Sequence, residues 1–286
     1  MGDFLVVAQL PITQLLTMHP KQLLTRYQIE PKKSLGQNFL FDENVLARIV
    51  EAAELTPFEP VLEIGPGLGS LTRFLARTAA SVTAVELDQR FLPILQTELA
   101  YFENVHIIHG DILEQNLDAL FDQPYKVVAN VPYYITGAIL RHLLSAKQKP
   151  ASVVMTVQKE VAERITAVPP KMSLLAISTQ LYGTPELIST IKAGAFWPRP
   201  DVDSAVLRLT LFPEPQIPFA EEKKFFTIVK AGFSQKRKQL KNNLRQLGYN
   251  QDEVSALLQA AEVDGRRRAE TLTLTEWLAI YQTLNL

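Results

Sequence analysis

Three short apolar runs in this chain end in residues that can bind a nucleoside. The first run stops at a glycine-rich turn that begins with Gly65, and glycine lets a ligand approach the backbone closely because it has no Cβ. The second run ends at Glu86, whose carboxylate can accept hydrogen bonds from both hydroxyls of a ribose. The third leads into Asp111, which can accept a hydrogen bond from an adenine amino group. Together these positions predict a site for a nucleoside-containing cofactor.

Simpler explanations exist for the glycine-rich turn and for Asp111. The glycine-rich turn could bind no ligand, and Gly110-Asp111 could be an ordinary turn after a strand. Asp88 suits a helix N-cap better than a ligand, because a helical stretch begins at Arg90. A nicotinamide dinucleotide is disfavoured because the turn has the spacing G-x-G-x-G, whereas the dinucleotide fingerprint is G-x-G-x-x-G.

A fourth apolar run ends in Asn130-Val131-Pro132-Tyr133, which resembles the signature of methyltransferases that modify an exocyclic amino group. The lone pair of adenine N6 is delocalised into the ring, so this nitrogen needs acceptors for its two hydrogens more than it needs a strong base. The side-chain oxygen of Asn130 and the backbone carbonyl fixed by Pro132 can supply both acceptors. Tyr133 would stack on a base that has left its own stack. A structural Asn-x-Pro turn is the alternative.

The elements that must position these residues alternate along the first part of the chain. Helical stretches separate most of the short apolar runs, which is typical of an α/β fold with a parallel sheet covered by helices on both faces. The predicted strands are 61–64, 81–86, 105–108, 126–129 and 153–157.

After residue 157 this alternation ends. Segments 176–182 and 186–191 could each be helix or strand, whereas 202–211 has the alternation of a strand. Prolines at positions 213, 215 and 218 cannot continue a sheet, so we expect a linker and domain boundary at 213–219.

The remainder predicts helices only, including one long helix over 221–247 and a last helix that opens with a capping box at Thr273. We therefore expect an N-terminal extension at 1–30, an α/β domain at 31–212 and a small all-helical domain at 219–286.

Composition excludes several classes of protein. The 286 residues include no cysteine, which rules out disulfides and thiolate chemistry, and the four histidines show no spacing typical of metal ligands. We therefore expect no metal. No apolar run is long enough to span a bilayer, and the N-terminal stretch lacks the charged lead-in of a secretion signal, so we expect a cytoplasmic protein with no membrane partner.

The net charge of −1 argues against a uniformly basic nucleic-acid binder, but basic residues gather between positions 221 and 248. On a single helix, four of them would share a face suited to phosphates, although a solvated face is equally compatible with their spacing. These four residues are Arg237, Lys238, Lys241 and Arg245.

Taken together, five motifs resemble those of the ribosomal RNA adenine dimethyltransferases, and in particular the branch that acts on the small subunit. They are Lys32 to Leu40 (KKSLGQNFL), Glu63 to Gly69 (EIGPGLG) with Glu86, Gly110-Asp111, Asn130 to Tyr133, and Phe196 to Ser204 (FWPRPDVDS). The acidic residue before the glycines and the proline between them are similar to the first motif of S-adenosylmethionine-dependent methyltransferases. The resemblance extends from about residue 22 to the C-terminus.

This resemblance implies a Rossmann-like class I methyltransferase sheet with S-adenosylmethionine as the cofactor. It implies dimethylation at N6 of two adjacent adenosines near the 3′ end of 16S rRNA in the 30S particle, by a monomer with a role in small-subunit biogenesis. For the cofactor, it places Asn38 and Leu40 at the methionine end, Gly65 at the amino acid portion, Glu86 at the ribose and Asp111 at the adenine. For catalysis, it implies roles for Asn130, Pro132 and Tyr133, with Asn130 also lying against the cofactor. It places Phe196 at the target base.

One departure and two alternatives accompany the resemblance. Tyr134 stands where the small-subunit enzymes commonly have asparagine, which puts the rim of the pocket in doubt, and Phe196 could instead be only a core aromatic residue. The related enzymes that methylate 23S rRNA and confer macrolide resistance are strongly basic as a rule, so the near-neutral charge here favours the small subunit. A ribosome-assembly factor that binds without catalysis is the other alternative, and retention of Asn130 and Tyr133 argues against it.

Overall fold

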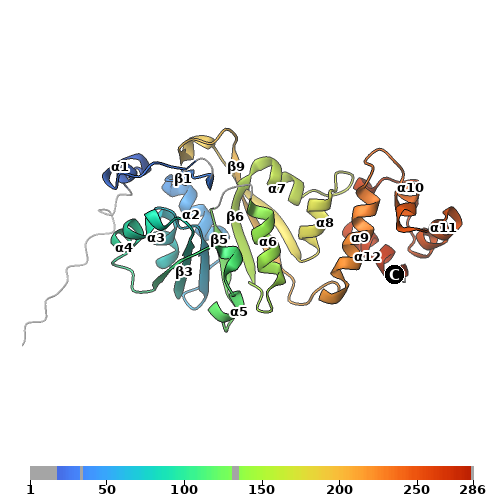
Figure 1. Ribbon diagram of the computed structural model, residues 1–286, viewed down its shortest axis with the longest axis horizontal. Helices are drawn as coiled ribbons and strands as arrows, with labels where there is room; N and C mark the ends of the chain where they lie inside the picture. The colour runs from blue at the N-terminus through green and yellow to red at the C-terminus, as the bar shows by residue number, and fades with distance from the viewer. Residues whose placement is uncertain (1–17, 33–34, 131–134, 285–286) are drawn as a thin grey trace, which may run out of the picture.

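A seven-stranded sheet forms the centre of the computed structural model, which describes residues 18–32, 35–130 and 135–284 (Figure 1). The strand order is β4-β3-β2-β5-β6-β9-β7. The strands are β2 (Pro60–Ile64), β3 (Ser81–Glu86), β4 (Val105–His109), β5 (Lys126–Ala129), β6 (Ser152–Gln158), β7 (Gly183–Ile191) and β9 (Ser204–Leu211).

The five strands predicted from apolar runs are confirmed, and they pair in parallel in the order β4-β3-β2-β5-β6. The last two are antiparallel, because β9 runs against β6 and β7 runs against β9, so the complete sheet is mixed. The two ambiguous segments divide between a helix, α8 (Leu174–Gln180), and the edge strand β7.

Alternate side chains of each central strand pack on opposite faces of the sheet. Val61 lies in a core with residues of α2 (Glu43–Ala52) and α3 (Ser70–Ala76), whereas Leu62 lies in the core that includes α6 (Thr136–Ser145) and α7 (Lys159–Ile165). Strands buried on both faces need apolar residues at nearly every position, which explains why the sequence shows continuous runs.

A two-stranded ribbon joins segments that are far apart in the sequence. In it, β1 (Phe39–Leu40) pairs antiparallel with β8 (Phe196–Trp197), and Leu40 lies opposite Phe196. Beside this ribbon, α1 (Pro20–Arg26) buries Leu23 and Leu24 in a cluster that includes Phe39. The segment from residue 18 to residue 30, predicted to be part of an extension, therefore packs on the α/β domain, while residues 1–17 lie outside the described part of the chain.

The C-terminal region is helical, but the prediction of one helix over 221–247 is wrong. This segment divides into α9 (Glu222–Phe233), a turn at 234–239, α10 (Leu240–Leu244) and the 3-10 helix η8 (Arg245–Leu247). The buried Asn243 side chain donates hydrogen bonds to the carbonyls of Gly232, at 2.6 Å, and Gln235, at 3.1 Å, which a continuous helix would give to backbone N–H groups. The four basic residues therefore do not share one helix face.

Helices α11 (Gln251–Ala260) and α12 (Leu274–Thr283) complete this region around a core that contains Phe225 and Trp277. The same core includes Ala176 and Ile177 of α8, a helix that precedes the proline-rich linker. In Figure 1, α8 accordingly lies between the sheet and α9. The hydrophobic core of the helical region therefore includes residues from before the linker as well as after it.

Candidate active site

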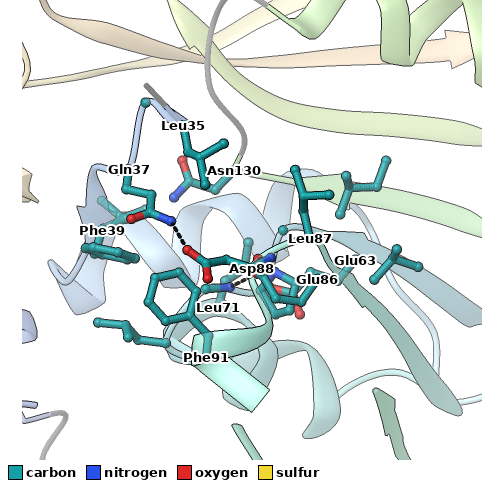
Figure 2. A pocket seen from close by; sticks show the side chains of 18 of the residues that line it. Leu35, Gln37, Phe39, Glu63, Leu71, Glu86, Leu87, Asp88, Phe91 and Asn130 are labelled. Carbon is teal, nitrogen blue, oxygen red and sulfur yellow. Dashed lines mark hydrogen bonds between the residues drawn. The ribbon is translucent and has the colours of Figure 1, made fainter. Parts of the chain in front are cut away.

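The carboxyl ends of the parallel strands border a pocket that gathers the predicted site residues (Figure 2). The loops after β2, β3, β4 and β5 contribute to its lining, as expected for ligand sites in open α/β sheets. Pro132 and Tyr133 lie outside the described residues, as does Tyr134, so the roles given to them stay predictions. The predicted residues that line the pocket are Asn38, Leu40, Gly65, Glu86, Asp111, Asn130 and Phe196.

The glycine-rich turn has a backbone conformation that side chains disfavour. Gly65, Gly67 and Gly69 have φ angles of 70°, 56° and 79°, all in the left-handed region that glycine tolerates best. Gly69 is also the N-cap of α3. The turn thus depends on glycine for its shape, and it presents backbone to the pocket without a Cβ in the way.

Glu86 lies at the end of β3 and is 5% exposed. Its Oε2 accepts a hydrogen bond from the N–H of Gly67 at 2.9 Å, and its Oε1 accepts one from the N–H of Asp88 at 2.7 Å. Burial raises the pKa of Glu86, although these backbone hydrogen bonds act in the opposite direction. A carboxylate has about four acceptor positions, so these two hydrogen bonds leave acceptor capacity for a ligand's hydroxyls.

Asp88 anchors the rim of the pocket. It caps the 3-10 helix η3 (Gln89–Phe91), as the sequence predicted, and Gln37 Nε2 donates to its Oδ2 at 2.8 Å, as the dashed line in Figure 2 shows. Arg90 Nε donates to its Oδ1 at 2.8 Å, and mainly this contact lowers the pKa of Asp88 to about 2. Arg90 Nη1 also donates to the carbonyl of Glu30 at 3.1 Å. These bonds hold the segment before β1 against the pocket.

Glu63, on β2, also lines the pocket, although its position in the sequence predicted no ligand for it. It is 1% exposed, and among the described residues its Oε2 has no hydrogen-bond partner. Burial raises the pKa of Glu63 to about 8, and the nearby charge of Glu86 adds to the rise. A carboxylate inside the otherwise apolar run 60–64 is the signal that could have identified it.

Asp111 combines both roles considered for it. Its Oδ1 accepts a hydrogen bond from the N–H of Leu113 at 2.9 Å and so caps the 3-10 helix η4 (Ile112–Glu114), while the residue also lines the pocket. Phe196 likewise packs in the core beside Leu40 and lines the pocket, with only 3% of its surface exposed. The turn and core explanations are therefore compatible with a ligand site.

The donor and acceptor set fits the expected cofactor. Acceptors at Glu86 and Asp111 suit ribose hydroxyls and an adenine amino group. Histidine and carboxylate side chains in the described ranges form no group of three that could hold a metal ion. In the same ranges, no helix has the length and apolar character needed to cross a membrane.

Known proteins match this chain over most of its length. Residues 29–285 match the family described as ribosomal RNA adenine dimethylase. A relative from Dehalococcoides mccartyi (strain CBDB1), named ribosomal RNA small subunit methyltransferase A, is 43% identical over 276 residues, which is 96% of this chain and 94% of the relative. A relative of the same name from Bacillus licheniformis is 41% identical, with 92% and 94% of the two chains covered.

Solved structures show the same architecture. The 23S rRNA methyltransferase ErmE is 32% identical with a TM-score of 0.73, and the alignment covers 87% of this chain and all of that one (100%). A dimethyladenosine transferase from Plasmodium falciparum, at 23% identity, shares the fold with a TM-score of 0.74 over 85% of this chain and 95% of its own. Both therefore support the class I methyltransferase fold predicted for the sheet domain.

Proposed function

The chain belongs to the ribosomal RNA adenine dimethylase family, and from this we propose that it dimethylates N6 of two adjacent adenosines near the 3′ end of 16S rRNA in the 30S particle. It is an S-adenosylmethionine-dependent methyltransferase. The observation that carries the proposal is the convergence of seven predicted site residues on one pocket. Relatives named for the small subunit, with 41–43% identity over nearly the whole chain, support 16S rRNA as the substrate.

The acidic residues and the glycine turn would hold the cofactor. Glu86 would accept hydrogen bonds from the ribose hydroxyls and Asp111 one from the adenine amino group, while Asn38 and Gly65 would border the methionine portion. S-adenosylmethionine supplies an electrophilic methyl group on a sulfonium. Because this cofactor carries positive charge, the carboxylates of Glu63 and Glu86 favour it electrostatically when they are ionised.

Asn130 would act on the target adenine. Its side-chain oxygen accepts a hydrogen bond from the N6 amino group, and that bond strengthens as the nitrogen gains positive charge during transfer. Phe196 would form part of the wall against the base, since it lines the same pocket. Tyr133 would stack on the base, as its motif implies.

We place rRNA docking partly on the helical region. Arg237 and Lys238 are exposed on the turn between α9 and α10, and Arg245 is exposed on η8. Exposed cations grouped in this way suit phosphate contacts, which position a protein on RNA without reading its sequence. The protein would act as a cytoplasmic monomer without a metal.

A methyl-transfer experiment tests this function. Labelled cofactor is supplied with immature 30S subunits, 50S subunits or free RNA, and the Asn130→Ala variant serves as the catalytic control. We expect label at the paired adenosines of 16S rRNA in 30S subunits only. Label in 50S subunits or 23S rRNA would assign the protein to the 23S enzymes, to which ErmE belongs by its name. Tight 30S binding without label would indicate an assembly factor.

A further inference from the structure

The side chain of Asn130 is bonded to a residue on the neighbouring strand. The hydroxyl of Thr156, on β6, donates a hydrogen bond to Oδ1 of Asn130. The strand register explains the contact, because Ala129 at the end of β5 lies opposite Met155 of β6, and Asn130 and Thr156 are the residues that directly follow these two. Thr156 is fully buried, with 0% exposure.

We propose that Thr156 is a positioning residue for methyl transfer, which holds the carboxamide of Asn130 in the plane required to accept a hydrogen bond from the target amino group. This inference rests on the proposed function and assigns a residue to the same site. Neither the resemblance nor the comparisons give Thr156 a role.

The chemistry of the carboxamide supports this assignment. Rotation about the last side-chain torsion of asparagine is only weakly restricted, so an isolated carboxamide samples many planes. A carbonyl oxygen has two lone pairs, and the Thr156 hydroxyl uses one of them. The other remains available to an N–H donor. Among the described residues, Thr156 is the hydrogen-bond donor found for Oδ1 of Asn130, so the contact fixes the plane of the carboxamide with one of its two acceptor positions.

The location of Thr156 makes it a rigid anchor. It lies in β6, where it pairs with Val206 of β9 and directly follows Met155, the last residue of β6 that pairs with β5. A β-branched side chain also has few allowed rotamers. Burial of a hydroxyl costs free energy unless it is hydrogen-bonded, and among the described residues Asn130 is the partner found for it. An apolar residue at this position would suit the sheet equally well, which points to a function for the hydroxyl.

Two substitutions separate the hydroxyl from the shape of the side chain. Thr156→Val keeps the shape and removes the donor, whereas Thr156→Ser keeps the donor. With cofactor and RNA saturating, we expect Thr156→Val to lower the single-turnover rate about 3–10-fold, the range for loss of one neutral hydrogen bond. Thr156→Ser should stay within about twofold of wild type. Affinities for cofactor and for 30S subunits should not change.

A matched control tests whether any buried threonine would give this result. Thr179, on α8, is 3% exposed and donates its hydroxyl to the carbonyl of Leu175 at 3.0 Å. It does not line the pocket. Thr179→Val should therefore leave the single-turnover rate unchanged, even if the melting temperature falls.

A double-mutant cycle tests the route by which Thr156 acts. If it acts only through Asn130, Thr156→Val should cause no further loss of rate in an Asn130→Ala background. An equal fold loss in both backgrounds, or a wild-type rate for Thr156→Val, would overturn the proposal. The cycle is run on whichever RNA the wild-type protein methylates, so inactivity on 30S subunits overturns the proposed substrate instead. Methylation of no RNA at all would overturn both.

Discussion

The N–H of Gly67 donates a hydrogen bond to Oε2 of Glu86 at 2.9 Å, so the carboxylate predicted to hold the ribose also holds the glycine-rich turn. The turn and the carboxylate come from the ends of neighbouring parallel strands, β2 and β3. A substitution at Glu86 should therefore affect the ligand contact and the shape of the turn together.

Cofactor affinity should depend strongly on Glu86. We expect Glu86→Ala to weaken S-adenosylmethionine binding about 10–150-fold, which corresponds to roughly 1.5–3 kcal/mol for hydrogen bonds to a charged group. Calorimetric titration measures this, and Glu86→Gln, which keeps the shape and one acceptor, should lose less. Thermal melting checks the fold, because the alanine variant also leaves the N–H groups of Gly67 and Asp88 without their partner. Unchanged affinity in a folded Glu86→Ala protein would remove Glu86 from the site.

Catalysis should separate from binding at Asn130. The bond from its oxygen to the target amino group stabilises the transition state more than the ground state. Asn130→Ala should therefore lower the single-turnover rate about 10²–10³-fold at saturating cofactor, with little change in 30S affinity. Asn130→Asp should retain part of the activity, since a carboxylate still accepts hydrogen bonds. A wild-type rate for Asn130→Ala would reduce the Asn-Val-Pro-Tyr stretch to a structural turn.

Binding to 30S subunits should depend on salt through the basic residues of the helical region. We expect Gln substitutions at Arg237, Lys238 and Arg245 together to weaken binding and to reduce the slope of log K against log salt by about 2–3, because each phosphate contact releases counterions. The control replaces three exposed cations of the α/β domain, Arg48, Arg77 and Lys147, by Gln, which removes the same charge. Identical slopes for wild type and the Arg237, Lys238 and Arg245 variant would assign these residues to solvation alone.

The stability of the cofactor-free protein should fall with rising pH because of Glu63. Burial in the folded protein raises the pKa of Glu63 from 4.5 to about 8. Between these two pH values the folded protein keeps a proton on Glu63 that the unfolded chain has released. The free energy of unfolding of wild type should therefore decline, relative to Glu63→Gln, from about pH 4.5 to about pH 8 and stay level above it. Urea titrations at pH 5, 7 and 9 measure it. A difference between the two proteins that does not vary with pH would show that Glu63 does not retain this proton.

Much of the site could be predicted because its residues follow apolar runs. Parallel strands place their carboxyl ends at one edge of the sheet, so Gly65, Glu86 and Asn130 converge without any knowledge of their contacts. The ribbon between β1 and β8 has no such local signal, since its two strands are far apart in the sequence. It was the family resemblance that linked Asn38 and Leu40 with Phe196 in one site.

Other features could not be predicted because a distant side chain decides them. The break after α9 depends on Asn243, whose hydrogen bonds to Gly232 and Gln235 exist only when α10 folds back. Apolar residues recur at helical spacing on both sides of the break, and the polar run 234–239 between them is compatible with the solvent-exposed part of one helix. Thr156 was similarly hidden inside the predicted strand 153–157, where a single hydroxyl does not change the apolar pattern.

The position of α8 limits how this protein can be recombined with its relatives. A chimera cut at the prolines 213–218 would keep Ala176, Ile177 and Leu181 from one parent and the helices that cover them from another. Core positions tolerate exchange only when the volumes of both sides still match. Because α8 lies between β6 and β7 in the chain, no single crossover point leaves both cores intact. Functional hybrids should therefore need a second exchange, limited to the α8 side chains that face the helical region.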